Sequence, residues 1–173
     1  MKIIVGVDDS PHSQAAIEAI KRMSWPRGTR VVVIAAVRPL VGAYVEAYVP
    51  APDIAPAVED EQLEHYRTVA ARGQRELASA GFEAESRAVS GDPRDVLVDA
   101  ATRERADLLV VGSHGRSGLA RLLIGSVASH VVTHAPCDVL VVKRSAAAER
   151  SGAGDLHARR SGTTSREEPH SWG

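Results

Sequence analysis

Four runs of apolar residues and one weaker, alternating segment recur along the chain and predict five β-strands. Two of them, residues 30–37 and 107–111, are apolar on both faces, which is typical of parallel strands covered on both sides. Residues 82–90 alternate between apolar and polar side chains and indicate a strand at the edge of a sheet. The other two runs are residues 2–7 and 138–143.

Between these runs, apolar residues three and four positions apart predict four helices. Pro11 marks the start of the first helix, with Asp9 or Ser10 as its cap. Pro93 marks the start of the third, with Asp92 as its cap. The positions that define the helices are Ala16, Ala19, Ile20 and Met23; Leu63, Tyr66, Ala70, Gly73 and Leu77; Val96, Leu97, Ala100 and Ala101; and the segment from Ser126 to about His134.

Strands and helices alternate throughout this pattern. Because helical crossovers between parallel strands are right-handed, the order predicts an α/β fold: an open, doubly wound, five-stranded parallel sheet in the order 3-2-1-4-5 with helices on both faces. Such a sheet binds its ligand at the carboxyl ends of the strands, where the winding direction reverses. Asp8 and Gly112, at the ends of strands one and four, are therefore expected to face one cleft.

Two segments fall outside the alternation. Residues 40–56 are mixed in character and rich in proline, which predicts an irregular excursion. Residues 145–173 carry too little apolar surface to order themselves, so we expect a domain at residues 1–144 followed by a disordered tail. Arg159, Arg160 and the Ser/Thr cluster near them leave open a partner-binding or phosphorylation role for the tail.

Composition narrows the class of protein. The 173 residues are 44% apolar and carry a net charge of −1, which is ordinary for a globular protein. Aromatic residues make up only 3%, and there is no excess of positive charge, so we expect no nucleic-acid partner. The amino-terminal apolar run is too short for a signal peptide or a membrane span, and the single Cys137 excludes an internal disulfide. These features favour a soluble cytoplasmic protein without a membrane partner.

A glycine-rich loop joins the fourth strand to the last helix. Gly112 ends the strand, Gly115 follows after two residues, and Gly125 comes nine residues later, directly before Ser126. Glycine lets an anion approach the backbone without a Cβ in the way, and a helix start presents unpaired N–H groups. The loop is therefore a candidate phosphate cradle, although such glycines can also serve only the turns between a strand and a helix.

Asp8 is the candidate acid on the other side of the cleft. Its carboxylate could accept a hydrogen bond from a ribose hydroxyl or hold a divalent ion beside phosphates. The alternative for Asp8, and more strongly for Asp9, is helix capping.

Other reactive residue types carry weaker signals. His130 and His134 have a spacing that two zinc ligands can use, but no third ligand is evident, so packing or helix-end charge is favoured and no metal site is predicted. Cys137 has no CxxC partner and adjoins a buried strand, which favours a core thiol. No residue pattern pairs a nucleophile with a base, so no catalytic residue is predicted.

Three segments resemble the universal stress protein family. The spacing of residues 112–126 matches the family's Gly-2x-Gly-9x-Gly-Ser/Thr nucleotide motif. Residues 6–10, GVDDS, look like the end of the family's first strand, and residues 135–142, APCDVLVV, are similar to its last. The resemblance covers about residues 1–144 and implies ATP binding, with Mg²⁺ as an option, and a homodimer formed through the strand between Asp138 and Lys143.

The resemblance also implies which residues contact the nucleotide. Asp8 would face the ribose or a nucleotide-bound divalent ion, and the backbone of Ala36 would meet the adenine. The residues that would surround the ribose and phosphates are Gly112, Ser113, Gly115, Arg116, Gly118, Gly125, Ser126 and Val127.

One residue departs from the family pattern. Asp9 stands where many members have glycine, and its charge could either weaken polyphosphate binding or help to recruit a divalent ion.

These observations lead to two main hypotheses about function and a weaker third one. The leading hypothesis is an ATP-binding regulator or sensor in a stress response. The alternative is a weak ATPase or nucleotidyl-transfer enzyme of the same fold group. A structural dimer with an empty cleft is the weaker third option.

Overall fold

A computed structural model describes residues 1–38, 55–115 and 124–144. The chain divides into two compact units, Met1–Lys143 and Arg144–Gly173, and the sheet with its helices belongs to the first. Most of the predicted excursion at 40–56, and the whole predicted tail at 145–173, lie outside the described residues.

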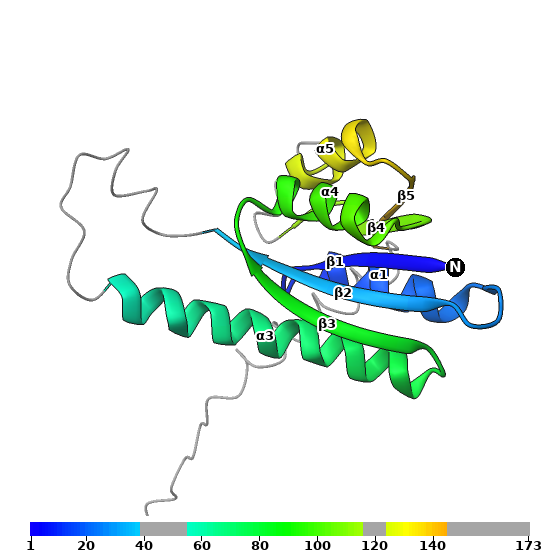
Figure 1. Ribbon diagram of the computed structural model, residues 1–173, viewed down its shortest axis with the longest axis horizontal. Helices are drawn as coiled ribbons and strands as arrows, with labels where there is room; N and C mark the ends of the chain where they lie inside the picture. The colour runs from blue at the N-terminus through cyan, green and yellow to red at the C-terminus, as the bar shows by residue number, and fades with distance from the viewer. Residues whose placement is uncertain (39–54, 116–123, 145–173) are drawn as a thin grey trace, which may run out of the picture. The chain divides into compact units, whose positions relative to one another are not determined.

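Nine elements make up the described part of the first unit, and they alternate as the sequence predicts (Figure 1). In chain order they are β1 (Lys2–Val7), α1 (Pro11–Arg22), β2 (Arg30–Val37), α3 (Ala55–Ser79), β3 (Glu83–Ser90), α4 (Pro93–Glu104), β4 (Leu108–Gly112), α5 (Ser126–His134) and β5 (Asp138–Val142).

The five strands form one parallel sheet in the order β3-β2-β1-β4-β5, which confirms the predicted topology. β1 is central: Val5 pairs with Val33 of β2 on one side and with Val110 of β4 on the other. The winding direction reverses between β1 and β4, so the carboxyl ends of these strands flank the expected ligand cleft.

Two apolar layers cover the sheet, one on each face. In Figure 1, α1 and α3 lie on one face, and α4 and α5 lie on the other. Ile3 and Val5 of β1 point into the first layer, where they meet Ile17 of α1 and Leu77 of α3. Ile4 points the opposite way, into the layer of α4 and α5. This alternation explains why, after Lys2 and Arg30 at their starts, β1, β2 and β4 carry no charged or polar side chain on either face.

Capping side chains that the sequence predicted fix the starts of α1 and α4. Ser10, rather than Asp9, caps α1, because its hydroxyl accepts from the backbone N–H of Ser13 at 3.1 Å. Asp92 caps α4 and accepts from the N–H of Arg94 at 2.9 Å. α5 begins after Gly125, which offers no side chain to its first turn.

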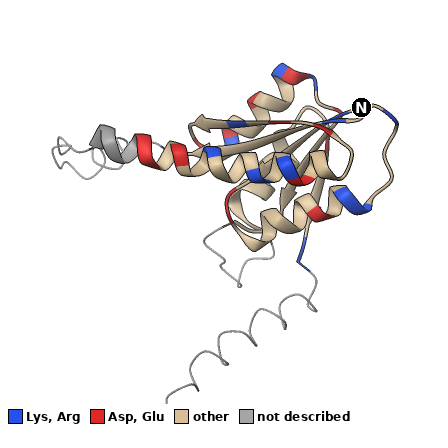
Figure 2. Ribbon diagram, turned by 90° about the horizontal axis from the view of Figure 1, so that it is seen from below, with Lys and Arg blue, Asp and Glu red and all other residues tan. Residues whose placement is uncertain are grey.

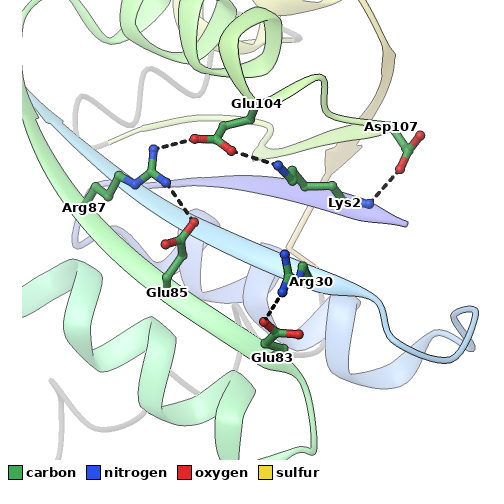
Figure 3. A network of polar contacts seen from close by, with 7 residues as sticks. All are labelled: Lys2, Arg30, Glu83, Glu85, Arg87, Glu104 and Asp107. Carbon is green, nitrogen blue, oxygen red and sulfur yellow. Dashed lines mark hydrogen bonds and ion pairs between the residues drawn. The ribbon is translucent and has the colours of Figure 1, made fainter.

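A charged network ties the end of α4 to the sheet (Figure 3). Glu104 accepts from Lys2 Nζ at 2.9 Å and from Arg87 Nη1 at 2.7 Å, and both contacts hold the pKa of its carboxyl below the usual range. The Lys2 backbone N–H donates to Asp107 at 2.7 Å. These contacts join α4 to β1 and β3 away from the carboxyl ends of the strands, so we assign them to the fold rather than to the site.

Candidate functional site

A cavity of about 1110 Å³ opens at the carboxyl ends of the strands. β1, β2 and β4 contribute their ends, and helices of both layers contribute walls, which is the location predicted for a ligand in this topology. The lining residues from the strand ends are Gly6, Val7, Asp8, Ile34, Ala36, Val37, Arg38, Val111 and Gly112. Those from helices and the β4–α5 loop are Ser13, Glu61, Gln62, His65, Tyr66, Pro93, Leu97, His114, Gly115, Gly125, Ser126, Val127 and Ala128.

Asp8 lies in the turn between β1 and α1, and local hydrogen bonds hold its position. Its Oδ1 accepts from the N–H of Ser10 at 3.3 Å, and its own N–H donates to Ser13 Oγ at 3.3 Å. The Oδ2 atom lies close to Gly115, since a Cβ built on that glycine would be 2.7 Å from it. The structure therefore brings the predicted acid and the predicted glycine loop together.

Gly112 and Gly115 are both needed as glycine, for different reasons. A Cβ on Gly112 would lie 2.6 Å from the backbone carbon of His12, so this glycine lets α1 pack directly on the end of β4. Among the described residues, a Cβ on Gly115 would meet only the carboxylate of Asp8. Gly112 thus serves the fold, and Gly115 keeps the cavity open in front of Asp8.

The amino terminus of α5 faces the cavity. The Gly125 N–H donates to the Ser113 carbonyl at 2.7 Å, and the Gly125 carbonyl accepts the first helical bond, from the Ser129 N–H at 2.9 Å. The N–H groups of Ser126, Val127 and Ala128 precede that bond, and Gly125 provides no side chain to accept from them. Helix-start N–H groups at a cavity wall suit an anion.

Ser113 lies behind the wall of the cavity rather than on it. Only 1% of its surface is exposed. Its N–H donates to the carbonyl of Val142 at 2.7 Å, its carbonyl accepts from Gly125, and its hydroxyl lies 3.1 Å from Nδ1 of His114. Ser113 therefore links β5, the loop and α5.

Most of the predicted nucleotide contacts lie around this one cavity. Arg116 and Gly118 lie outside the described residues. The predicted residues that line the cavity are Asp8, Ala36, Gly112, Gly115, Gly125, Ser126 and Val127.

Asp9, the departure from the family pattern, is turned toward α3. Its backbone has φ 58°, a left-handed conformation that is uncommon for residues other than glycine. Its carboxylate lies 2.9 Å from Arg72 Nη2 and 3.7 Å from His65 Nε2, and it does not line the cavity. The Asp9 carboxylate thus faces Arg72 of α3 rather than the cavity.

Several lining residues carried no signal in the sequence. His114 lies within the glycine motif, and its ring centroid is 5.2 Å from that of His12. α3 supplies a polar wall, and Figure 2 shows acidic residues toward the amino-terminal part of this helix and basic residues farther along. Solvent-facing helix positions and cavity-facing ones look alike in sequence, so this wall was not predictable. Its lining residues are Glu61, Gln62, His65 and Tyr66.

The other candidate groups remain apart from the cavity. The rings of His130 and His134 are stacked with centroids 4.1 Å apart, and His130 Nε2 lies 3.8 Å from Asp95 Oδ1. Within the described ranges, no three His, Cys, Asp or Glu side chains form a group that could hold a metal. Burial raises the pKa of the Cys137 thiol, and Asp138 and Asp107 add to that effect.

The fold and the cavity define a doubly wound α/β protein with a glycine-lined cavity at its switch point. The model of the Universal stress protein family matches residues 1–143. The chain belongs to this family. In the parts of the chain that the structure describes, no helix has both the length and the apolar character needed to cross a membrane.

Three similar proteins show how far the likeness extends. The universal stress protein in the QAH/OAS sulfhydrylase 3′ region of Thermus aquaticus is 31% identical over 142 residues, which are 82% of this chain and 97% of that protein. The solved structure of hypothetical protein MJ0577 has a TM-score of 0.72 at 26% identity, over 83% of this chain and 96% of that one. A universal stress protein solved in complex with cAMP has a TM-score of 0.58 at 27% identity, over 84% of this chain and 98% of that one.

Proposed function

We propose that the cavity binds an adenine nucleotide, in the first place ATP, and that the protein acts as a nucleotide-dependent regulator in a stress response. The observation that carries this proposal is the meeting of Asp8, Gly115 and the amino terminus of α5 around one cavity. The complex of a related protein with cAMP supports the adenine assignment. The proposed place of action is the cytoplasm.

Different groups that line the cavity suit the phosphates, the ribose and the base of a nucleotide. Phosphates suit the N–H groups of Ser126 and Val127, since anions are stabilised at helix starts. The ribose hydroxyls suit the carboxylate of Asp8, which accepts hydrogen bonds and could also hold a Mg²⁺ ion carried by the phosphates. The adenine suits the apolar end of the cavity, around Ala36 and Leu97.

The burial of a serine–histidine pair next to the cavity favours a regulatory role over catalysis. Ser113 Oγ lies 3.1 Å from His114 Nδ1, which is the contact that an activated nucleophile would need. Ser113 is only 1% exposed, however, and a nucleophile must reach its substrate. We therefore assign this pair to the support of the loop.

Binding is tested by equilibrium titration of purified protein with ATP in the presence of Mg²⁺. The wild type should bind saturably, and Gly115→Val should lose most of this affinity because its side chain would displace the Asp8 carboxylate. Ser129→Ala is the control, since Ser129 is on α5, the helix that follows the loop of Gly115, but does not line the cavity. The absence of saturable binding by the wild type, or equal affinities for the wild type and Gly115→Val, would overturn the proposal.

Turnover is tested separately, because a weak ATPase or nucleotidyl transferase would use the same site. We expect ATP hydrolysis by the wild type, Asp8→Asn and Ser126→Ala to equal that of buffer in a steady-state phosphate assay. Hydrolysis that is above buffer in the wild type and lost in Asp8→Asn would establish the enzyme instead.

We further propose that the protein is a homodimer formed through β5. This strand is the last of the sheet and pairs only with β4 among the described strands. An outer strand presents unpaired backbone groups that a second copy can satisfy.

A further inference from the structure

Arg38 extends the wall of the cavity at the end of β2. It follows directly after Val37, lines the cavity, and forms an ion pair with Asp92, where Nη2 and Oδ2 lie 3.1 Å apart. The turn from β3 into α4 brings Asp92 to this place, because the Gly91 N–H donates to the Val37 carbonyl at 2.8 Å. Gly91 adopts φ 150°, and a Cβ there would lie 2.8 Å from Val96, so the turn requires glycine.

Two guanidinium groups share the single carboxylate of Asp92. Arg94 makes three contacts with this carboxylate. Its Nε donates to Oδ1 at 3.0 Å, its Nη2 donates to Oδ2 at 2.8 Å, and its backbone N–H also donates to Oδ1. Arg38 has one contact, with an oxygen that Arg94 already uses. Arg38 is therefore the less neutralised of the two and, unlike Arg94, lines the cavity.

Arg38 is placed to contact the base of a bound nucleotide rather than its phosphates. The phosphate-binding N–H groups belong to α5, which follows β4, whereas Arg38 follows β2. β1 lies between these two strands, so their ends are separated by two strand spacings, about 10 Å. A nucleotide with its phosphates at α5 and its ribose at Asp8 extends its base toward β2.

We propose that Arg38 determines base specificity in this cavity by donating hydrogen bonds to acceptor atoms on the edge of a purine, with Asp92 as its positioning residue. This inference rests on the proposed nucleotide site. A guanidinium offers only donors in a rigid plane, and N1, N3 and N7 of adenine are acceptors in the plane of the base. N7 belongs to the ring that cytosine lacks, so a donor aimed at it favours ATP over CTP. The lining around it, with Ala36, Pro93 and Leu97, is apolar, so a planar base and one cationic donor group complement this end of the cavity.

The test compares ATP with CTP, which share the ribose and the triphosphate and differ in the base. Their dissociation constants are measured by calorimetric titration for the wild type, Arg38→Ala and Arg94→Ala. Arg94→Ala is the matched control because it removes the same charge beside the same carboxylate without changing the cavity wall. Arg38→Lys keeps the charge and removes the planar donor group.

We expect Arg38→Ala to weaken ATP binding about tenfold, as for the loss of a hydrogen bond from a charged group, and to leave CTP binding within about twofold. The preference for ATP over CTP should fall about tenfold in Arg38→Ala, fall substantially in Arg38→Lys, and stay unchanged in Arg94→Ala. Thermal unfolding of each variant checks that the fold is intact.

Two results would overturn the inference. An unchanged preference for ATP over CTP in Arg38→Ala, including an equal weakening of both nucleotides, would leave at most an effect of charge. The same loss of preference in Arg94→Ala would remove Arg38 from base recognition. Absence of ATP binding by the wild type is a different result, because it would contradict the proposed function itself, whereas a changed preference is measurable only where the wild type binds.

Discussion

Gly112 and Gly115, three residues apart in one loop, are expected to respond differently to the same substitution. Gly112→Ala places a Cβ 2.6 Å from the backbone of His12, so α1 or β4 must move. Such overpacking costs about 1–3 kcal/mol of unfolding free energy. Gly115→Ala meets only the end of a side chain, Asp8, and should cost less stability while weakening ATP binding. Urea unfolding and ATP titration of both variants check this, and equal losses of stability would contradict it.

Cys137 is expected to react slowly with thiol reagents. Burial raises the pKa of its thiol, and the nearby acids Asp138 and Asp107 raise it further. The thiolate is the reactive form, so a raised pKa lowers its fraction at neutral pH. Alkylation of the folded protein at pH 7.5 should be slower than that of the urea-unfolded chain and should accelerate as the pH rises. Equal rates for the folded and unfolded chain would show an accessible, ordinary thiol.

Residues of the site differ in how far the sequence could predict them. Gly112, Gly115 and Gly125 were predictable because a turn or a close backbone approach leaves a residue type and a spacing in the sequence. Arg38 was not, because its contact with Asp92 depends on how the turn after β3 folds back onto β2. The orientation of the Asp9 side chain was also not predictable from the sequence, since its partner Arg72 is remote in the chain.

At the scale of elements, the cap of α4 should make stability depend on pH. The side chain of Arg94 is the largest cause that holds the pKa of Asp92 well below its ordinary value of 3.8, and the Arg94 backbone N–H and Arg38 add to it. A carboxyl with a lowered folded pKa stabilises the native state above the unfolded value, and this contribution decreases as the pH falls toward the folded value. Asp92→Ala should therefore cost about 1 kcal/mol or more at pH 7, including the lost cap.

Asp92→Asn separates the charge from the cap, because asparagine caps helices as well as aspartate does. At pH 7 it should be less stable than the wild type and more stable than Asp92→Ala. The difference between wild type and Asp92→Asn should shrink between pH 5 and pH 3, measured by urea unfolding at each pH. Taking the difference cancels the parallel contribution of Glu104, whose pKa is also lowered. A constant difference across this range would show that the charge of Asp92 contributes nothing.

The elements were predicted well because their signals are local. Apolar runs located all five strands to within about a residue: β4, for example, begins at Leu108 rather than Asp107, whose carboxylate instead accepts from the Lys2 N–H. The start of α3 at Ala55 was not predicted, since the proline-rich stretch before it obscures the boundary. Helical periodicity cannot reveal which exposed residues of α3 face a cavity made by other elements.

For the molecule as a whole, the two edges of the sheet are protected to different degrees. β3 carries Glu83, Glu85 and Arg87 at exposed positions, and such charges discourage pairing with another strand. β5 has only Asp138 exposed, at its start, and its other residues are apolar and half-buried. The contrast favours β5 as the edge that meets a second copy.

The proposed dimer should therefore dissociate when a charge is placed on β5. Val141→Lys puts an ammonium group in the middle of the apolar edge, where a dimer interface would have to bury it without a partner. We expect the wild type to sediment as a dimer at micromolar concentration and Val141→Lys as a monomer. Ser90→Lys, at the exposed end of the opposite edge strand, is the control and should remain dimeric. Thermal unfolding must show Val141→Lys to be folded, since Val141 also packs against the layer of α4 and α5. A monomeric wild type, or a Val141→Lys variant that is folded and dimeric, would exclude assembly through β5.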